Sequence, residues 1–90
     1  MAKVGAFSVD GLELFFYSND HIPPHFHVVK PGEWEIRVNF MKSTAESLEY
    51  SEVWSKKSRT LKSKERKELR EKIVAHRADL LREWEKKVDY

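Results

Sequence analysis

Residues 34–40 show the clearest pattern in the chain, a strict alternation of apolar and polar side chains. Every second residue from Trp34 to Phe40 is large and apolar, and the residues between them are polar. Successive side chains of a β-strand point to opposite faces of its sheet. The alternation therefore predicts a strand with one buried face.

Further segments have the composition of strands. Residues 4–9 and 12–17 flank Asp10-Gly11, a strong signal for a two-residue turn, so we expect them to form a hairpin. Residues 25–29 follow a Pro-Pro pair and are expected to form the third strand, ahead of the one at 34–40. Residues 48–54 suit either a fifth strand or a short helix, and we favour the strand.

The last third of the chain has the spacing of one long helix. Ser63 is a suitable N-cap. Apolar residues then recur at helical steps, interrupted by the polar pair His76-Arg77; they are Leu69, Ile73, Leu80, Leu81, Trp84 and Val88. A straight helix over residues 63–88 would be roughly 40 Å long, at about 1.5 Å per residue. That exceeds what a small sheet covers, so we expect one end to project or to meet a second subunit.

Together these elements predict one α+β domain spanning residues 1–90. Residues 1–54 form an antiparallel meander of four or five strands, and one long C-terminal helix, residues 63–88, packs on one face. A domain of this length buries only about 60–65% of its unfolded surface. Its margin of stability is thin, so dimerisation or ligand binding is expected to contribute.

Composition excludes several classes of protein. The chain has no cysteine, which excludes disulfides, cysteine zinc sites and thiol nucleophiles. No segment approaches the roughly 18 apolar residues of a membrane span, and the N-terminus has no apolar signal core. We therefore expect a cytoplasmic protein without a membrane partner. Three scattered glycines build no phosphate-binding loop, so we expect no ATP, NAD or flavin.

Charge divides the chain into two unlike parts. Residues 1–54 carry four Lys or Arg and eight Asp or Glu, whereas residues 55–90 carry thirteen and seven. The basic part begins with a lysine- and arginine-rich stretch that includes Lys56, Lys57 and Arg59. It suits either RNA or DNA phosphates or a solvated connector and helix start, and we favour the connector. No interleaved aromatic residues offer base stacking.

Three of the four histidines lie within residues 19–27, Asn-Asp-His-Ile-Pro-Pro-His-Phe-His. His25 and His27 are two apart on an expected strand, so both point to the sheet surface opposite the core. Proline restricts its own backbone and that of its predecessor, so the loop before them is stiff. If it curls back, His21 joins His25 and His27 with Asp20 at hand, and three imidazoles suit a divalent ion such as zinc.

The histidine cluster also suits roles that need no metal. Its rings could recognise phosphate or carboxylate groups, take part in acid–base chemistry, or serve a structural role in which each ring bonds a backbone carbonyl. Tyr17 and Asn19, just before them, suit either a polar pocket or turn capping. His76 lies on the expected helix, where it either faces the sheet and meets the cluster or lies on the helix surface.

The same stretch carries a resemblance to a known family. Residues 15–28, Phe-Phe-Tyr-Ser-Asn-Asp-His-Ile-Pro-Pro-His-Phe-His-Val, resemble the Tyr-Ser-x-(Asp/Glu)-His-x-Pro-Pro-His-x-His-Val signature of the small bacterial family "domain of unknown function 4160". Gly32 and a helix that ends near Trp84 fit the same plan, and residues 41–62 depart from it. The resemblance implies a cytoplasmic bacterial protein whose gene neighbours suggest toxin–antitoxin-like pairs, and it implies no established molecular activity.

Two functions follow from these observations as hypotheses. The first is an interaction module of a toxin–antitoxin-like or regulatory pair, which binds a protein partner, a second copy of itself or RNA through the rigid histidine loop. We favour this module, and the alternative is a metal-dependent hydrolase, such as a nuclease. In that case His21, His25 and His27 ligate the ion, Asp20 is a ligand or general base, and the basic connector holds phosphates.

Overall fold

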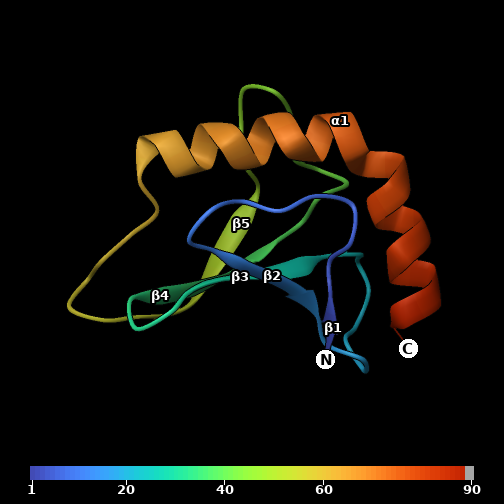
Figure 1. The fold of residues 1–90 in the computed structure, drawn as a ribbon, viewed down its shortest axis with the longest axis horizontal. Helices are drawn as coiled ribbons and strands as arrows, with labels where there is room; N and C mark the ends of the chain where they lie inside the picture. Colours follow the sequence, from blue (N-terminus) through green and yellow to red (C-terminus); the bar gives the residue numbers. More distant parts are fainter. Residues whose placement is uncertain (89–90) are drawn as a thin grey trace.

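Five strands form one antiparallel sheet, and their order in space follows their order in the chain (Figure 1). The structure is a computed structural model that describes residues 1–88. Its elements are β1 (Ala2–Lys3), β2 (Glu13–Phe16), β3 (Phe26–Lys30), β4 (Trp34–Val38), β5 (Tyr50–Ser55) and α1 (Ser63–Lys87). This confirms the predicted α+β meander with one long C-terminal helix.

The alternation along the strands places the core as expected. Leu14, Val28 and Ile36 lie opposite one another on three neighbouring strands, and all three are buried. The buried residues of α1 pack over this face of the sheet; they are Leu69, Ile73, Leu80 and Trp84. A sheet that is covered on one side by a helix needs one apolar face, which the period-two pattern supplies.

Residues 4–9 do not form the predicted strand. β1 contains only Ala2 and Lys3 and pairs with the end of β2, so the Asp10-Gly11 turn joins no paired strands. Instead the segment passes between the sheet and α1 (Figure 1), where Phe7 contacts Phe26 edge-on. The apolar side chains of this segment gain more from burial in the core than from a hairpin.

β5 confirms the fifth strand and contains an irregularity. Glu35 lies opposite Trp54, but the next residue of β4 lies opposite Glu52, so Val53 is the extra residue of a bulge. A bulge changes which face the following side chain points to. Here it puts Trp54 on the face of the sheet that carries Glu35, away from α1.

The helix is bent rather than straight, which corrects the expected 40 Å rod. His76 has non-helical backbone angles (φ −121°, ψ 17°), and α1 turns there into a second segment beside the sheet (Figure 1). The longest dimension of the molecule is 34 Å, so neither end of the helix projects. Arg77 supports the bend, because its Nε donates to the Phe40 carbonyl at 3.1 Å.

The helix begins differently from the prediction. Ser63 is the first helical residue, and Lys62 is the N-cap. The Lys62 amide donates to Glu65 Oε1 at 2.9 Å, so a glutamate in the first turn caps the N-cap amide, and Ser63 is not the cap. α1, the helix in the described part of the chain, is not apolar enough along its length to cross a membrane.

Candidate metal centre

The loop between β2 and β3 folds back on itself and fixes Asp20. The Tyr17 amide donates to Asp20 Oδ2, and the Asp20 amide donates to the Tyr17 carbonyl, both at 3.3 Å. Ser18 and Asn19 form the exposed tip of this turn. The Asp20 carboxylate consequently points back toward the start of β3.

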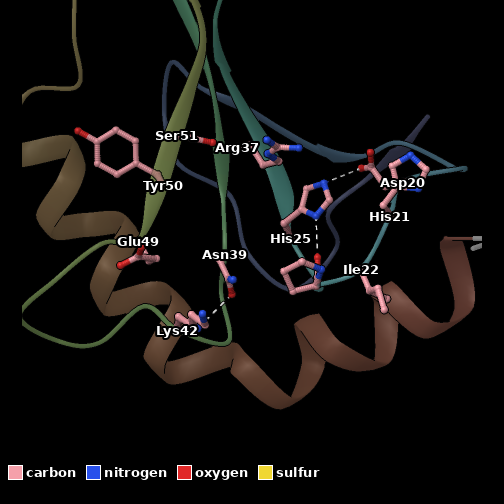
Figure 2. Close-up of a pocket in the computed structure, with 11 residues that line it drawn as sticks. Asp20, His21, Ile22, His25, Arg37, Asn39, Lys42, Glu49, Tyr50 and Ser51 are labelled. Atoms are coloured by element: carbon pink, nitrogen blue, oxygen red, sulfur yellow. Dashed lines mark hydrogen bonds and ion pairs between the residues drawn. The ribbon is translucent and has the colours of Figure 1, made fainter.

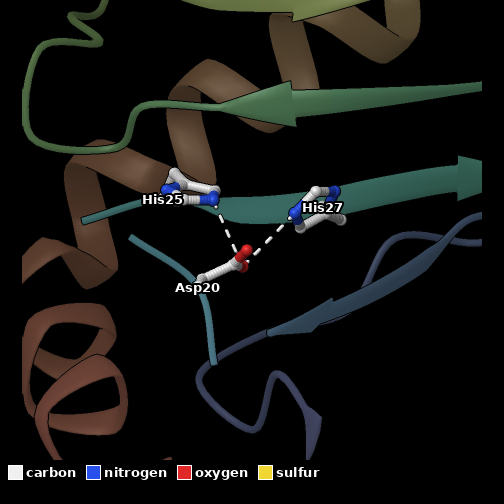
Figure 3. Close-up of side chains that lie close together, drawn as sticks. All are labelled: Asp20, His25 and His27. Atoms are coloured by element: carbon white, nitrogen blue, oxygen red, sulfur yellow. Dashed lines mark ion pairs between the residues drawn. The ribbon is translucent and has the colours of Figure 1, made fainter. Parts of the chain in front are cut away.

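Asp20 lies between His25, the residue just before β3, and His27 of β3 (Figure 3). Asp20 Oδ2 is 3.2 Å from His25 Nε2 and 3.3 Å from His27 Nε2. Ligand atoms of the three residues all lie within 4.8 Å of one another. The loop therefore curls back, and the side chain that it brings to the cluster is Asp20 rather than His21.

The other ring nitrogen of each histidine, Nδ1, already has a hydrogen-bond partner. His25 Nδ1 is 2.8 Å from the Pro23 carbonyl, and His27 Nδ1 is 3.1 Å from Glu35 Oε2. A carbonyl and a carboxylate only accept hydrogen bonds, so each Nδ1 carries the proton. A neutral ring of this tautomer has its lone pair on Nε2, the atom that faces Asp20.

The two Nε2 atoms are buried and have no hydrogen-bond partner within residues 1–88. His25 is 5% exposed and His27 is 6% exposed. Neither ring lies on an open surface as predicted. Phe15 stacks on His27 and Tyr17 contacts its edge, whereas His25 contacts Trp84 of α1, with ring centroids 5.3 Å apart. A buried polar atom without a partner costs free energy, and here two of them face one carboxylate oxygen.

Glu35 organises the outer side of His27. Its Oε2 accepts from His27 Nδ1 and from the Tyr17 hydroxyl at 3.2 Å, and its Oε1 accepts from Trp54 Nε1 at 3.2 Å. Burial, with the nearby Glu35 charge, raises the pKa of Tyr17, so its phenol stays a donor. Burial also lowers the pKa of His27 and outweighs the opposing effects of Asp20 and Glu35, which favours the neutral ring.

This donor set fits a divalent transition metal. Atoms at the corners of a tetrahedron with bonds of about 2.0–2.1 Å are roughly 3.3 Å apart, and Asp20 Oδ2 lies at that separation from each nitrogen. A histidine that binds a metal through one ring nitrogen usually donates its other ring N–H to a carboxylate or a backbone carbonyl, as both Nδ1 atoms do here. Three protein ligands also leave a position for water or substrate.

A pocket of about 330 Å³ opens beside the cluster (Figure 2). Asp20 and His25 form part of its lining, at the end of the sheet where β3 begins, β4 ends and β5 begins. Arg37 and Lys42 contribute two cations to the lining, and Glu49 contributes an anion. An ion bound by the cluster would therefore be reachable from this pocket.

A family model with the description "Domain of unknown function (DUF4160)" matches residues 11–85. The chain belongs to this family. The matched part of this DUF4160 domain includes Asp20, His25, His27, the pocket and almost all of α1, whereas β1 lies outside it. No curated protein and no solved structure matched the chain.

Several predicted site residues of this DUF4160 domain lie outside the cluster. His21 is exposed and lines the pocket, but its ring is not in the group that converges. Asn19 is exposed in the turn, and Tyr17 acts through Glu35. His76 stacks on Phe7 at the helix bend, so it contacts the core rather than the cluster.

The basic connector is at the other end of the sheet. The Lys56 amide bonds the Glu33 carbonyl in the turn between β3 and β4, and Arg59 forms an ion pair with Glu33 at 3.2 Å. Lys57 follows at an exposed position with positive φ. A five-residue strand is roughly 17 Å long, so these cations do not line the pocket.

Sequence reasoning missed Glu35, Trp54, Arg37 and Lys42. Glu35 and Arg37 are on the polar face of the best-predicted strand, so the alternation does place them on the face of the histidines. It does not show that Glu35 touches His27, because that depends on how β3 and β4 pair. Trp54 reaches Glu35 only because of the bulge in β5.

Proposed function

We propose that the protein binds one divalent transition-metal ion through Asp20, His25 and His27, and that it is a metal-dependent hydrolase. One observation carries this proposal: two buried Nε2 atoms converge on the same carboxylate oxygen, at 3.2 and 3.3 Å. A cation bound there satisfies all three atoms at once. Relative to the sequence hypothesis, Asp20 replaces His21 as the third ligand.

Hydrolysis suits the ligand set and its surroundings. Two imidazoles and one carboxylate hold zinc in hydrolytic enzymes, where the ion lowers the pKa of bound water to about 7. The same set is also used for iron in oxygen chemistry, but the two separations of 3.2 and 3.3 Å from Asp20 Oδ2 match those of a tetrahedral site, which zinc prefers. The adjoining pocket supplies the access that a structural zinc site lacks.

Metal titration tests the ligand assignment. Metal-free protein is titrated with zinc and with manganese by calorimetry, and we expect one site that prefers zinc. His27→Ala should weaken zinc binding at least 100-fold. His21→Ala is the matched control, since it removes an imidazole four residues from His25, and it should bind zinc like the unchanged protein. An equal loss of zinc affinity in both variants, or no zinc binding by the unchanged protein, would overturn the proposal. Circular dichroism checks that each variant folds.

The remaining sequence predictions stay predictions. They are a toxin–antitoxin-like or regulatory pairing, a protein, RNA or second-copy partner, and a cytoplasmic location. A metal-dependent hydrolase is compatible with each of them. The length of the helix no longer supports a dimer, because the bend at His76 keeps both helix segments on the domain.

A further inference from the structure

Arg37 and Lys42 line the pocket but have no role in the metal site proposed above. Arg37 lies opposite His27 in the pairing of β3 and β4, and its side chain is exposed. Within residues 1–88, neither Arg37 nor Lys42 has a carboxylate in ion-pair range. At the other end of the sheet, by contrast, Lys30 pairs with Glu65 at 2.9 Å and Arg59 pairs with Glu33.

Arg37 lies close enough to the cluster in the fold to contact the same ligand. Figure 2 shows its guanidinium on the side of the sheet that carries the His25 ring and Asp20. Lys42 lies farther along the same pocket, beyond Asn39. A ligand that touches a metal ion at Asp20 and His25 is therefore within the lining that Arg37 and Lys42 also form.

The charge of the pocket changes when an ion is bound. The two cations, Arg37 and Lys42, balance the two anions, Asp20 and Glu49, in the pocket lining. A divalent ion adds two positive charges, so the loaded pocket attracts anions. The volume of about 330 Å³ is at the lower end of the range for small-molecule sites.

We propose that the pocket binds the phosphoryl group of a small phosphate monoester, with one oxygen on the metal ion and others on Arg37, while Lys42 adds positive charge farther along the pocket, and that the protein hydrolyses this ester. The inference rests on the proposed metal site and names its substrate class. A phosphoryl group has three terminal oxygens, enough to meet a metal ion and the fork of an arginine together. A carboxylate has only two oxygens and meets fewer of these groups.

The reaction balances without a further reagent. Water attacks phosphorus, and the bond between phosphorus and the ester oxygen breaks. One proton of the water ends on the leaving alcohol oxygen, and the remaining hydroxyl oxygen stays on phosphorus. The products are an alcohol and inorganic phosphate, and nothing is oxidised or reduced.

Cobalt substitution gives a direct readout of ligand binding. The protein is loaded with Co²⁺, whose visible spectrum reports its ligands, and titrated with inorganic phosphate and, separately, with acetate. We expect phosphate to change the spectrum saturably and acetate to bind at least tenfold more weakly. Arg37→Gln should weaken phosphate at least tenfold without changing the spectrum of the phosphate-free site. Lys56→Gln, which removes one charge at the far end of the sheet, should leave phosphate affinity unchanged.

The outcomes separate this inference from the metal proposal. Failure to bind Co²⁺ would overturn the metal site itself. Normal Co²⁺ binding without a phosphate response would overturn only the substrate class, as would acetate that binds as tightly as phosphate. An equal loss of phosphate affinity in Arg37→Gln and Lys56→Gln would show a long-range charge effect and would overturn the assignment of phosphate to this pocket. With the zinc-loaded protein, Arg37→Gln should lower kcat/KM for p-nitrophenyl phosphate at least tenfold, and Lys56→Gln should not.

Discussion

At the scale of single residues, His27 is the most constrained side chain of the candidate site. Its Nδ1 bonds Glu35, its Nε2 faces Asp20, and its ring lies against Phe15 and Tyr17. These contacts set the tautomer, the orientation and the charge state of the ring. A metal ligand needs all three to be correct before the ion arrives.

Replacing Glu35 tests this organisation. In Glu35→Gln, one oxygen acceptor becomes an NH₂ donor, although Tyr17, His27 and Trp54 all donate to this side chain. We expect zinc affinity to fall about 10–100-fold and the free energy of unfolding to fall by about 1–3 kcal/mol, measured by calorimetry and urea denaturation. Tyr17→Phe is the matched control, because it removes one donor and keeps the bond between Glu35 and His27. Wild-type zinc affinity in Glu35→Gln would limit Glu35 to a structural role.

At the scale of elements, the bend in α1 brings its second segment to the site. Trp84 in that segment contacts both Phe16 of β2 and His25, with ring centroids 6.4 and 5.3 Å apart. A straight helix would carry Trp84 past the sheet. The end of the segment is tied down as well, since Lys87 Nζ donates to the Lys3 carbonyl at 2.9 Å.

Glu83 connects this segment to the residues after β1, and its contribution depends on pH. Its carboxylate accepts from the Gly5 amide at 2.7 Å and from Lys87 at 2.6 Å. Burial opposes the charge, but these hydrogen bonds outweigh it and lower the pKa of Glu83 below its ordinary value of 4.5. Because the pKa is lower in the folded state, the stabilisation is present above about pH 4.5 and is lost as the pH falls through the folded value.

Glu83→Gln should therefore show a pH-dependent loss. We expect it to lower the free energy of unfolding by about 1–2 kcal/mol at pH 7, with the difference from the unchanged protein shrinking below about pH 4.5. Urea denaturation at a series of pH values measures this. Glu85→Gln removes a carboxylate from an exposed position of the same turn and should cost less than about 0.5 kcal/mol. A difference that does not vary with pH would show that the charge of Glu83 contributes nothing.

At the scale of the whole molecule, one small hydrophobic core both stabilises the fold and positions the candidate site. β3 supplies His27 together with the core residues Phe26 and Val28, and the loop before it supplies Asp20 and His25. A ligand that binds only the folded state stabilises the whole domain. Metal binding should therefore be visible in global unfolding as well as at the site.

Thermal unfolding gives this prediction a magnitude. Zinc at 100 times its dissociation constant adds about 2.7 kcal/mol to the stability of the folded state. For a domain of this size that corresponds to a rise in Tm of roughly 10–20 °C, measured by calorimetry or circular dichroism. His27→Ala should show a rise of at most about 3 °C at the same zinc concentration, and magnesium, which prefers oxygen ligands, should give none with the unchanged protein. A similar rise in His27→Ala would place the zinc elsewhere on the chain.

The sequence by itself determined the strands from 12–17 onward, the long helix and the clustering of three histidines within residues 19–27. These features follow from local rules, because alternation, turn residues and helical spacing act over a few positions. Only the tertiary structure decided that residues 4–9 lie under the helix, that the helix bends, and that Asp20 rather than His21 faces the histidines. Those outcomes depend on strand register, on burial of Phe7 and on how a loop returns to the sheet, which are contacts between residues far apart in the chain.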